Sequence, residues 1–310
     1  MTSTDSPSHA IIRPVTDQES RSLSPWPDRI RNGGWKRERS NAQIDQEYDR
    51  ERYLAHLEAW RRHIERTSPH AGIIDRFFDR IRRTENDKLA AMPHVYGDID
   101  LKAYLVSVAD RLYAADLNVF EAMWRHWVIE QIAELHQDVQ FDHLIELGFG
   151  NGVNLFRAFN HIPLKSIGGM EVGTHAVELA RTIATDCGIP GSFTRMSIAD
   201  CVVTSPRPWA LLTIHAMEQV PDLSVDWFDR MVKDNPPRIG IHFEPMHFDD
   251  DCDFANQCRR YAQINGYNQD LASIATQAAD RGVIRIRKID KRVMGHSAFN
   301  PTSLLVWEPC

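Results

Sequence analysis

A twelve-residue run, LIELGFGNGVNL (144–155), combines an acidic residue with three glycines that are each separated by one residue. The apolar start is typical of a strand, and helical spacing follows Gly152. Gly148, Gly150 and Gly152 permit tight bending and close backbone approach to a ligand, whereas Glu146 places a carboxylate at the strand tip. A carboxylate there would repel a pyrophosphate, so we expect a nucleotide-like ligand that carries a cation or an amine.

The run resembles motif I of the class I S-adenosylmethionine (SAM) dependent methyltransferases. In that family the acidic residue and the glycine loop hold the methionine part of the cofactor. The resemblance covers residues 141–308. It implies that SAM is the cofactor and that Glu146, Gly148, Gly150 and Gly152 bind it.

A second acidic residue, Glu171, ends the next apolar run nineteen residues after Gly152. An acidic residue about 20 positions beyond a glycine loop is typical of one that accepts the hydroxyls of a ribose. The segment MSIADC (196–201) is similar to the family's adenine-binding segment, which implies that Ala199 and Asp200 contact the adenine. A helix cap or turn is the alternative for this Asp.

Polar side chains also end the next two apolar runs. Ligands lie at the carboxyl ends of strands in open α/β sheets, so we expect these side chains to face the site. An imidazole that titrates near neutral pH can take a proton from a hydroxyl or an amine during methyl transfer. The expected catalytic set is His215, Glu218, His242 and Glu244, with His215 also bordering the cofactor.

This part of the chain departs from the family pattern, in which many members carry Asp or Asn where His215 stands. Two histidines and a carboxylate could also form a non-haem iron site, drawn from His215, His242, Glu244 and His247. The spacing matches no established metal motif, so we expect no metal. Besides a proton acceptor and a metal ligand, a purely structural role is the third alternative for these histidines.

A polar helical segment between residues 251 and 281 is expected to form a wall of the acceptor pocket. Arg259, Tyr261 and Tyr267 are the predicted substrate-binding residues, because a guanidinium can bind a carboxylate or phosphate bidentately. Adjacent arginines on a helix face different ways, so at most one of Arg259 and Arg260 is expected to reach a substrate.

These side chains need a sheet to position them. Strand-like runs alternate with helical runs after residue 140, which predicts a doubly wound α/β sheet. The methyltransferase resemblance implies seven mostly parallel strands, with the last strand inserted antiparallel. The strands are expected at Leu144–Leu147, Ser166–Glu171, Leu211–His215, Ile239–Glu244, Val283–Ile289 and Leu304–Trp307, and helices at Val153–Phe159 and Ala176–Asp186.

We expect three parts in the chain. Residues 1–40 are rich in Ser, Pro, Arg and Asp and form a flexible arm or a lid. Residues 41–137 form a helical cap, because apolar side chains recur there at helical spacing, including Leu101–Leu112. Its aromatic residues are mostly core, and some of Tyr104, Tyr113, Trp124 and Trp127 could line a substrate pocket. Residues 138–310 form the SAM-binding domain.

The net charge and the apolar content of the sequence limit the kinds of partner that we expect. The formal charge of −7 and a pI near 6.0 argue against nucleic-acid binding, which needs a basic face. The chain has no apolar run of ~18 to 20 residues and no signal-peptide pattern at its start, so we expect a cytoplasmic protein without membrane contact. The five scattered cysteines are expected to be reduced thiols. A homodimer is compatible with the sequence.

The leading function is SAM-dependent methylation of an oxygen or nitrogen on a small molecule, in the manner of specialised metabolism. A metal-assisted methyltransferase acting on an oxo or hydroxy acid is the first alternative. A non-catalytic SAM-fold interaction protein is the second, and RNA methylation is disfavoured by the acidic charge.

Overall fold

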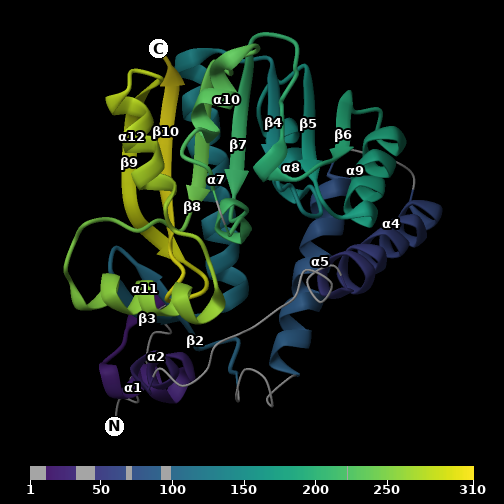
Figure 1. Ribbon diagram of the computed structural model, residues 1–310. Helices are drawn as coiled ribbons and strands as arrows, with labels where there is room; N and C mark the ends of the chain where they lie inside the picture. Colours follow the sequence, from purple (N-terminus) through teal and green to yellow (C-terminus); the bar gives the residue numbers. More distant parts are fainter. Residues whose placement is uncertain (1–11, 33–45, 68–71, 92–98, 222) are drawn as a thin grey trace, which may run out of the picture.

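The computed structural model describes residues 12–32, 46–67, 72–91, 99–221 and 223–310. Its centre is one mixed sheet of ten strands in the order β1-β3-β2-β9-β10-β8-β7-β4-β5-β6 (Figure 1). Five of them are parallel: β4 (His143–Leu147), β5 (Ser166–Glu171), β6 (Gly191–Arg195), β7 (Trp209–Ile214) and β8 (Ile239–Glu244). All twelve residues of β7 and β8 are buried, as in strands that are covered on both faces.

The antiparallel pair of strands expected at the end of the chain is present. Strand β10 (Thr302–Pro309) lies between β8 and β9 (Ile284–Gly295) and is antiparallel to both. Every strand and helix that the sequence predicted beyond residue 140 is present, with bounds that differ by a few residues.

The sheet has three strands more than the seven expected, and the N-terminal region expected to be helical also contains strands. Leu101–Leu112 is not a helix: it holds strand β2 (Tyr104–Val108) and the start of β3 (Arg111–Ala115). With β1 (Ile12–Pro14), these strands extend the sheet beyond β9. Ala109 and Asp110 form the turn with positive φ angles of 45° and 65°. Two such residues give the twist of a tight hairpin, but glycine or asparagine, which usually signals such a turn, is absent from it.

Helices cover both faces of the sheet. On one face, α4 (Leu54–Arg66), α5 (Ile73–Ala90), α7 (Leu117–Val139), α8 (Val153–His161) and α9 (Thr174–Asp186) build the larger core. On the other face, α10 (Trp227–Lys233) and α12 (Leu271–Asp280) pack with a 3-10 turn, η2 (Ile198–Asp200). No helix among the described residues is both long enough and apolar enough to cross a membrane.

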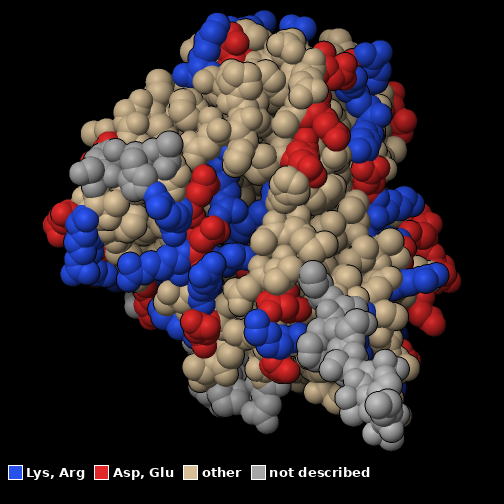
Figure 2. Space-filling view, turned by 180° about the vertical axis from the view of Figure 1, so that it is seen from behind, with Lys and Arg blue, Asp and Glu red and all other residues tan. Residues whose placement is uncertain are grey.

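The N-terminal elements lie near the carboxyl ends of the parallel strands (Figure 1). Helices α1 (Asp17–Leu23) and α2 (Trp26–Asn32) lie beside α11 (Asp253–Asn265), and a π-helix, η1 (Gln46–Tyr53), leads into α4. Part of the predicted arm is therefore regular structure, whereas residues 1–11 and 33–45 lie outside the described residues. Charged side chains of both signs share the face seen from behind, with Lys and Arg gathered around a hollow (Figure 2).

Arg292 ties these additions to the sheet. It is 4% exposed and donates to both carboxylate oxygens of Asp110, in the β2–β3 turn, at 2.6 and 3.0 Å. Its guanidinium also donates to Asp250, which follows β8, at 2.5 and 3.2 Å. Bidentate pairs of this kind fix orientation as well as distance.

Candidate functional site

The glycine loop joins β4 to α8 at the carboxyl edge of the sheet. Gly148, Gly150 and Gly152 all have positive φ angles, of 70°, 57° and 81°, which other residues rarely adopt. Gly148 also has no room for a side chain, because a Cβ there would lie 2.4 Å from the Cβ of Ala216. Sequence and structure therefore agree on why these positions are glycine.

Glu146 lies beneath this loop as a buried carboxylate, 1% exposed. Asn154 donates to its Oε1 at 3.3 Å, and its buried Oε2 has no partner among the described residues. Burial raises the pKa of Glu146 well above its usual value, and repulsion from Glu171 and Glu244 adds to the rise. Such a carboxylate would be stabilised by a cationic group on a ligand.

Glu171 ends β5 and receives three backbone N–H groups. Gly150 donates to its Oε2 at 2.9 Å, and Val172 and Gly173 donate to its Oε1 at 2.8 and 3.2 Å. Burial raises the pKa of Glu171, and these N–H groups partly offset the rise. A carboxylate can accept about four hydrogen bonds, and three of these positions on Glu171 are used. One position is therefore left for a ligand hydroxyl, and a second becomes available if the N–H of Gly150 points elsewhere.

Helix η1 covers the loop, a contact that the sequence did not reveal. A Cβ on Gly150 would lie 3.1 Å from the hydroxyl of Tyr53. Asp49, also in η1, accepts from the backbone N–H of His175 at 2.7 Å and lies 3.1 Å from its ring Nδ1. Tyr53 is one of the aromatic residues of the 41–137 region, which helical spacing predicts to be mostly core, and no local signal links Asp49 to a partner 126 residues away.

The predicted adenine segment forms η2, and Ser197 caps it by accepting from the N–H of Ala199 at 3.2 Å. The side chain of Asp200 lies outside the described part of the chain. Adenine contacts of Ala199 and Asp200 therefore remain predictions.

His215 follows β7 with a positive φ of 50°, which for a histidine indicates a position fixed by its surroundings. Its Nδ1 lies 3.5 Å from Oε1 of Glu218, whose Oε2 accepts from Asn300 at 2.7 Å. Its Nε2 lies 2.7 Å from Oγ1 of Thr302, which accepts from Trp124 at 2.9 Å. Trp124 occupies the hydroxyl oxygen as an acceptor, so the Thr302 proton is free to point at Nε2.

The electrostatic surroundings favour a proton on this histidine. Burial lowers the pKa of His215, but Glu218 and Glu244 raise it, and the net direction is upward. Nδ1 is oriented by a carboxylate and Nε2 receives a neutral hydroxyl, so Nε2 is the nitrogen that can take up a proton. Thr302 and Asn300 belong to the C-terminal part of the chain, where no motif marked them for chemistry.

Glu244 ends β8 and is 1% exposed. Its Oε1 accepts from the backbone N–H groups of Ala216 and Met217 at 2.9 and 3.2 Å, while its buried Oε2 has no partner among the described residues. Burial raises its pKa to about 7. The carboxyl therefore holds the turn after His215 in either protonation state.

His242 is not a strand-tip residue, and the structure contradicts its expected catalytic role. It is fully buried, and Trp307 donates to its Nε2 at 2.7 Å. Its Nδ1 must then carry the proton, which it donates to Oγ1 of Thr213 at 2.9 Å. Burial lowers the pKa of His242 to about 3, so this imidazole is neutral and structural.

The alternative metal set is not assembled. Within the ranges that the structure describes, no three His, Cys, Asp or Glu side chains are grouped to hold a metal ion. His242 is committed to Thr213 and Trp307. His247 has its backbone N–H bonded to Gln269 and its pKa lowered by burial and by Arg259.

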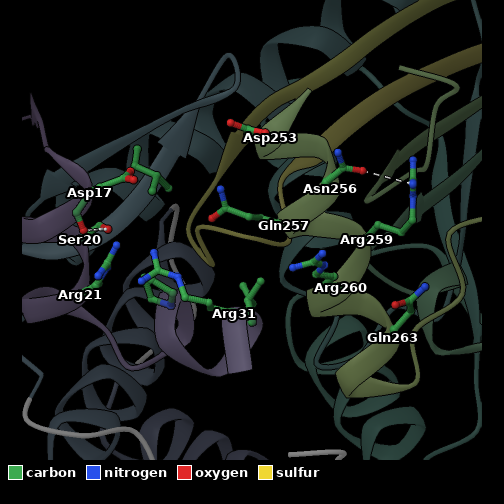
Figure 3. A pocket seen from close by; sticks show the side chains of 13 residues that line it. Asp17, Ser20, Arg21, Arg31, Asp253, Asn256, Gln257, Arg259, Arg260 and Gln263 are labelled. Atoms are coloured by element: carbon green, nitrogen blue, oxygen red, sulfur yellow. Dashed lines mark hydrogen bonds between the residues drawn. The ribbon is translucent and has the colours of Figure 1, made fainter. Parts of the chain in front are cut away.

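Two of the three predicted substrate residues lie together, because the ring centroids of Tyr261 and Tyr267 are 6.3 Å apart. Tyr267 is partly buried near Glu218, and Tyr261 packs edge-on against Trp26 with ring centroids 4.5 Å apart. Arg259 lines a polar cavity of about 580 Å³ between α2 and α11. Figure 3 shows Arg260 directed toward α2 and Arg259 extending along the other side of α11.

Comparison with known proteins gave no family model and no curated protein that matches. Among solved structures, the N-methyltransferase NodS from Bradyrhizobium japonicum WM9 matches with 16% identity and a TM-score of 0.44, over 62% of this chain and 97% of that chain. Geranyl diphosphate C-methyltransferase from Streptomyces coelicolor A3(2) matches with 12% identity and a TM-score of 0.43, over 58% and 76%. Mitomycin 7-O-methyltransferase MmcR matches with 12% identity and a TM-score of 0.45, over 59% and 53%. Structures of the first two contain S-adenosylhomocysteine.

Proposed function

We propose that this protein is a SAM-dependent methyltransferase of class I that methylates a small-molecule acceptor. One observation carries the proposal: two carboxylates, the buried Glu146 and the partly buried Glu171, flank a loop of three left-handed glycines at the carboxyl edge of a parallel sheet. A pyrophosphate would be repelled there, whereas a ligand with a sulfonium, an ammonium and a ribose would be bound.

In this proposal the residues present fit the cofactor. Glu146 has an unpartnered carboxylate oxygen for its positive end, and Glu171 has acceptor capacity for a ribose hydroxyl. SAM supplies a methyl group that is already activated by its sulfonium. The protein then has to align the acceptor, exclude water and remove a proton.

His215 is the proposed proton acceptor. Glu218 orients its Nδ1, so the proton arrives at Nε2, and Thr302 Oγ1 can turn from donor to acceptor as the imidazolium forms. We propose that η1 and α5 form the cap over the acceptor and that 138–310 is the cofactor-binding part. The net charge of −7 favours a small acceptor over a nucleic acid.

The test is calorimetric titration of the full-length protein with S-adenosylhomocysteine. We expect micromolar binding, weakened at least about tenfold by Glu171→Ala, because a hydrogen bond to a charged group is worth about 1.5–3 kcal/mol. Glu65→Ala removes an exposed carboxylate from α4 and serves as the matched control. Folded wild-type protein that releases no heat of binding would refute the proposal.

A further inference from the structure

Arg125 is a half-buried guanidinium next to the His215 network. It follows Trp124 in α7, and its Cζ lies 5.9 Å from the centroid of the Trp124 ring. In the part of the chain that the structure describes, it makes no hydrogen bond and no ion pair with another side chain. A half-buried cation loses part of its hydration, and without a direct partner this loss is not offset, so the arrangement needs an explanation.

The neighbouring arginines are compensated. Arg157 donates to Asp79 at 2.6 Å, and Arg82 donates to the carbonyl of Asn118 at 2.6 Å and lies 3.8 Å from Asp79. Burial is the largest cause that lowers the pKa of Arg125 to about 10, and these two cations add to it, whereas the charges of Glu121 and Glu85 oppose it without a direct ion pair. Arg125 therefore stays charged at neutral pH in a place that disfavours a cation.

The imidazole of His296 lies near Arg125 and also has a nitrogen without a hydrogen-bond partner among the described residues. His296 has its ring centroid 5.4 Å from that of Trp124 and 5.9 Å from that of His215. Its buried Nδ1 has no partner among the described residues. Burial, with His215 and Arg125 as further causes, lowers the pKa of His296 to about 3, so the ring is neutral and can donate one hydrogen bond.

We propose that Arg125 binds a carboxylate of the methyl acceptor, so the substrate is a carboxylic acid whose methylated atom lies beside His215. The inference rests on the proposed function and deepens it. A guanidinium binds a planar carboxylate bidentately, and that of Arg125 has no direct ion-pair partner among the described residues. A phosphate dianion would need a second cation without a direct partner, but Arg82 and Arg157 are already paired with Asp79.

The experiment uses full-length protein saturated with S-adenosylhomocysteine and two probes of the same shape, benzoate and benzamide. Binding of a ligand to the native state raises Tm by mass action. We expect millimolar benzoate to raise Tm more than benzamide does, with NaCl holding ionic strength equal. In Arg125→Gln the affinity for benzoate should fall at least about tenfold, as for a lost charged hydrogen bond. Arg83→Gln removes an exposed charge from α5 and should behave as wild type.

The outcomes separate the two proposals. Equal Tm shifts from benzoate in wild type and Arg125→Gln, or no shift in wild type that binds the nucleoside, would overturn the carboxylate assignment alone. Failure to bind S-adenosylhomocysteine would overturn the proposed function and this inference with it. Without ligands, Arg125→Gln should unfold at the same or a higher urea concentration, because no ion pair is lost. A clear loss of stability would show that Arg125 is structural.

Discussion

Replacing Glu244 by glutamine should make the stability of the protein less dependent on pH. The carboxyl is 1% exposed, and burial raises its pKa from the ordinary value of 4.5 to about 7. Because the folded-state pKa is above the unfolded one, the folded protein holds the proton more tightly. Stability from this group is fully present below pH 4.5 and is lost as the pH rises through about 7.

The magnitude follows from linkage. One pKa unit corresponds to about 1.4 kcal/mol, so the shift of Glu244 costs about 3 kcal/mol once the carboxyl is ionised in the folded state. Most of this cost, about 2.5 kcal/mol, develops between pH 5 and pH 8. The variant keeps an oxygen that can accept from the N–H groups of Ala216 and Met217 and carries no titrating proton.

Urea unfolding of wild type and Glu244→Gln at pH 5, 6, 7 and 8 measures the effect. We expect the variant to gain stability relative to wild type at each step, by about 2.5 kcal/mol in total. Glu65→Gln, at an exposed position of α4, should follow the wild-type curve. Parallel curves for wild type and Glu244→Gln would mean that a cation such as His215 fully compensates the ionised carboxylate, and the reasoning would be refuted.

Three further predictions concern turnover and stability. His215→Gln should keep affinity for S-adenosylhomocysteine within a few fold and lower turnover about a hundredfold, the usual size of a lost general base; unchanged single-turnover rates would contradict this. Trp307→Phe should lower the free energy of unfolding by about 1–3 kcal/mol, because His242 Nε2 loses its donor, and a smaller loss by urea titration would count against that hydrogen bond. Gly148→Ala should abolish nucleoside binding in calorimetry, because the new Cβ would lie 2.4 Å from the Cβ of Ala216; retained affinity would show that the loop can shift.

The geometry of the glycine loop and its two carboxylates could be predicted because its signals are local. Gly148, Gly150 and Gly152 adopt positive φ angles, and their spacing in the sequence already predicts a tight glycine loop. Glu146 and Glu171 end apolar runs that form β4 and β5, so their position at the sheet edge follows from the alternation of strands and helices.

The catalytic side could be predicted only in part, because its contacts are distant in sequence. His215 and His242 look alike in sequence, since each belongs to an apolar run. What separates them is the packing partner: His242 meets Trp307 inside the core, whereas His215 meets Glu218 and Thr302. The roles depend on contacts across 65 and 87 residues, which no local pattern reports.

Strand β2 has a mechanical consequence for how an acceptor could enter. Ser107 and Val108 pair with Gly295 and Met294 of β9, so β1, β2 and β3 belong to the same hydrogen-bonded sheet as the parallel strands. Moving β1, β2 and β3 away from β9 would break these backbone hydrogen bonds and the hydrogen bonds from Arg292 to Asp110. Helix η1 meets the glycine loop and Glu171 through the side chains of Tyr53 and Asp49 instead. Because η1 is held at the glycine loop by side-chain contacts, we expect it to move away from the loop more readily than β1, β2 and β3 move away from β9.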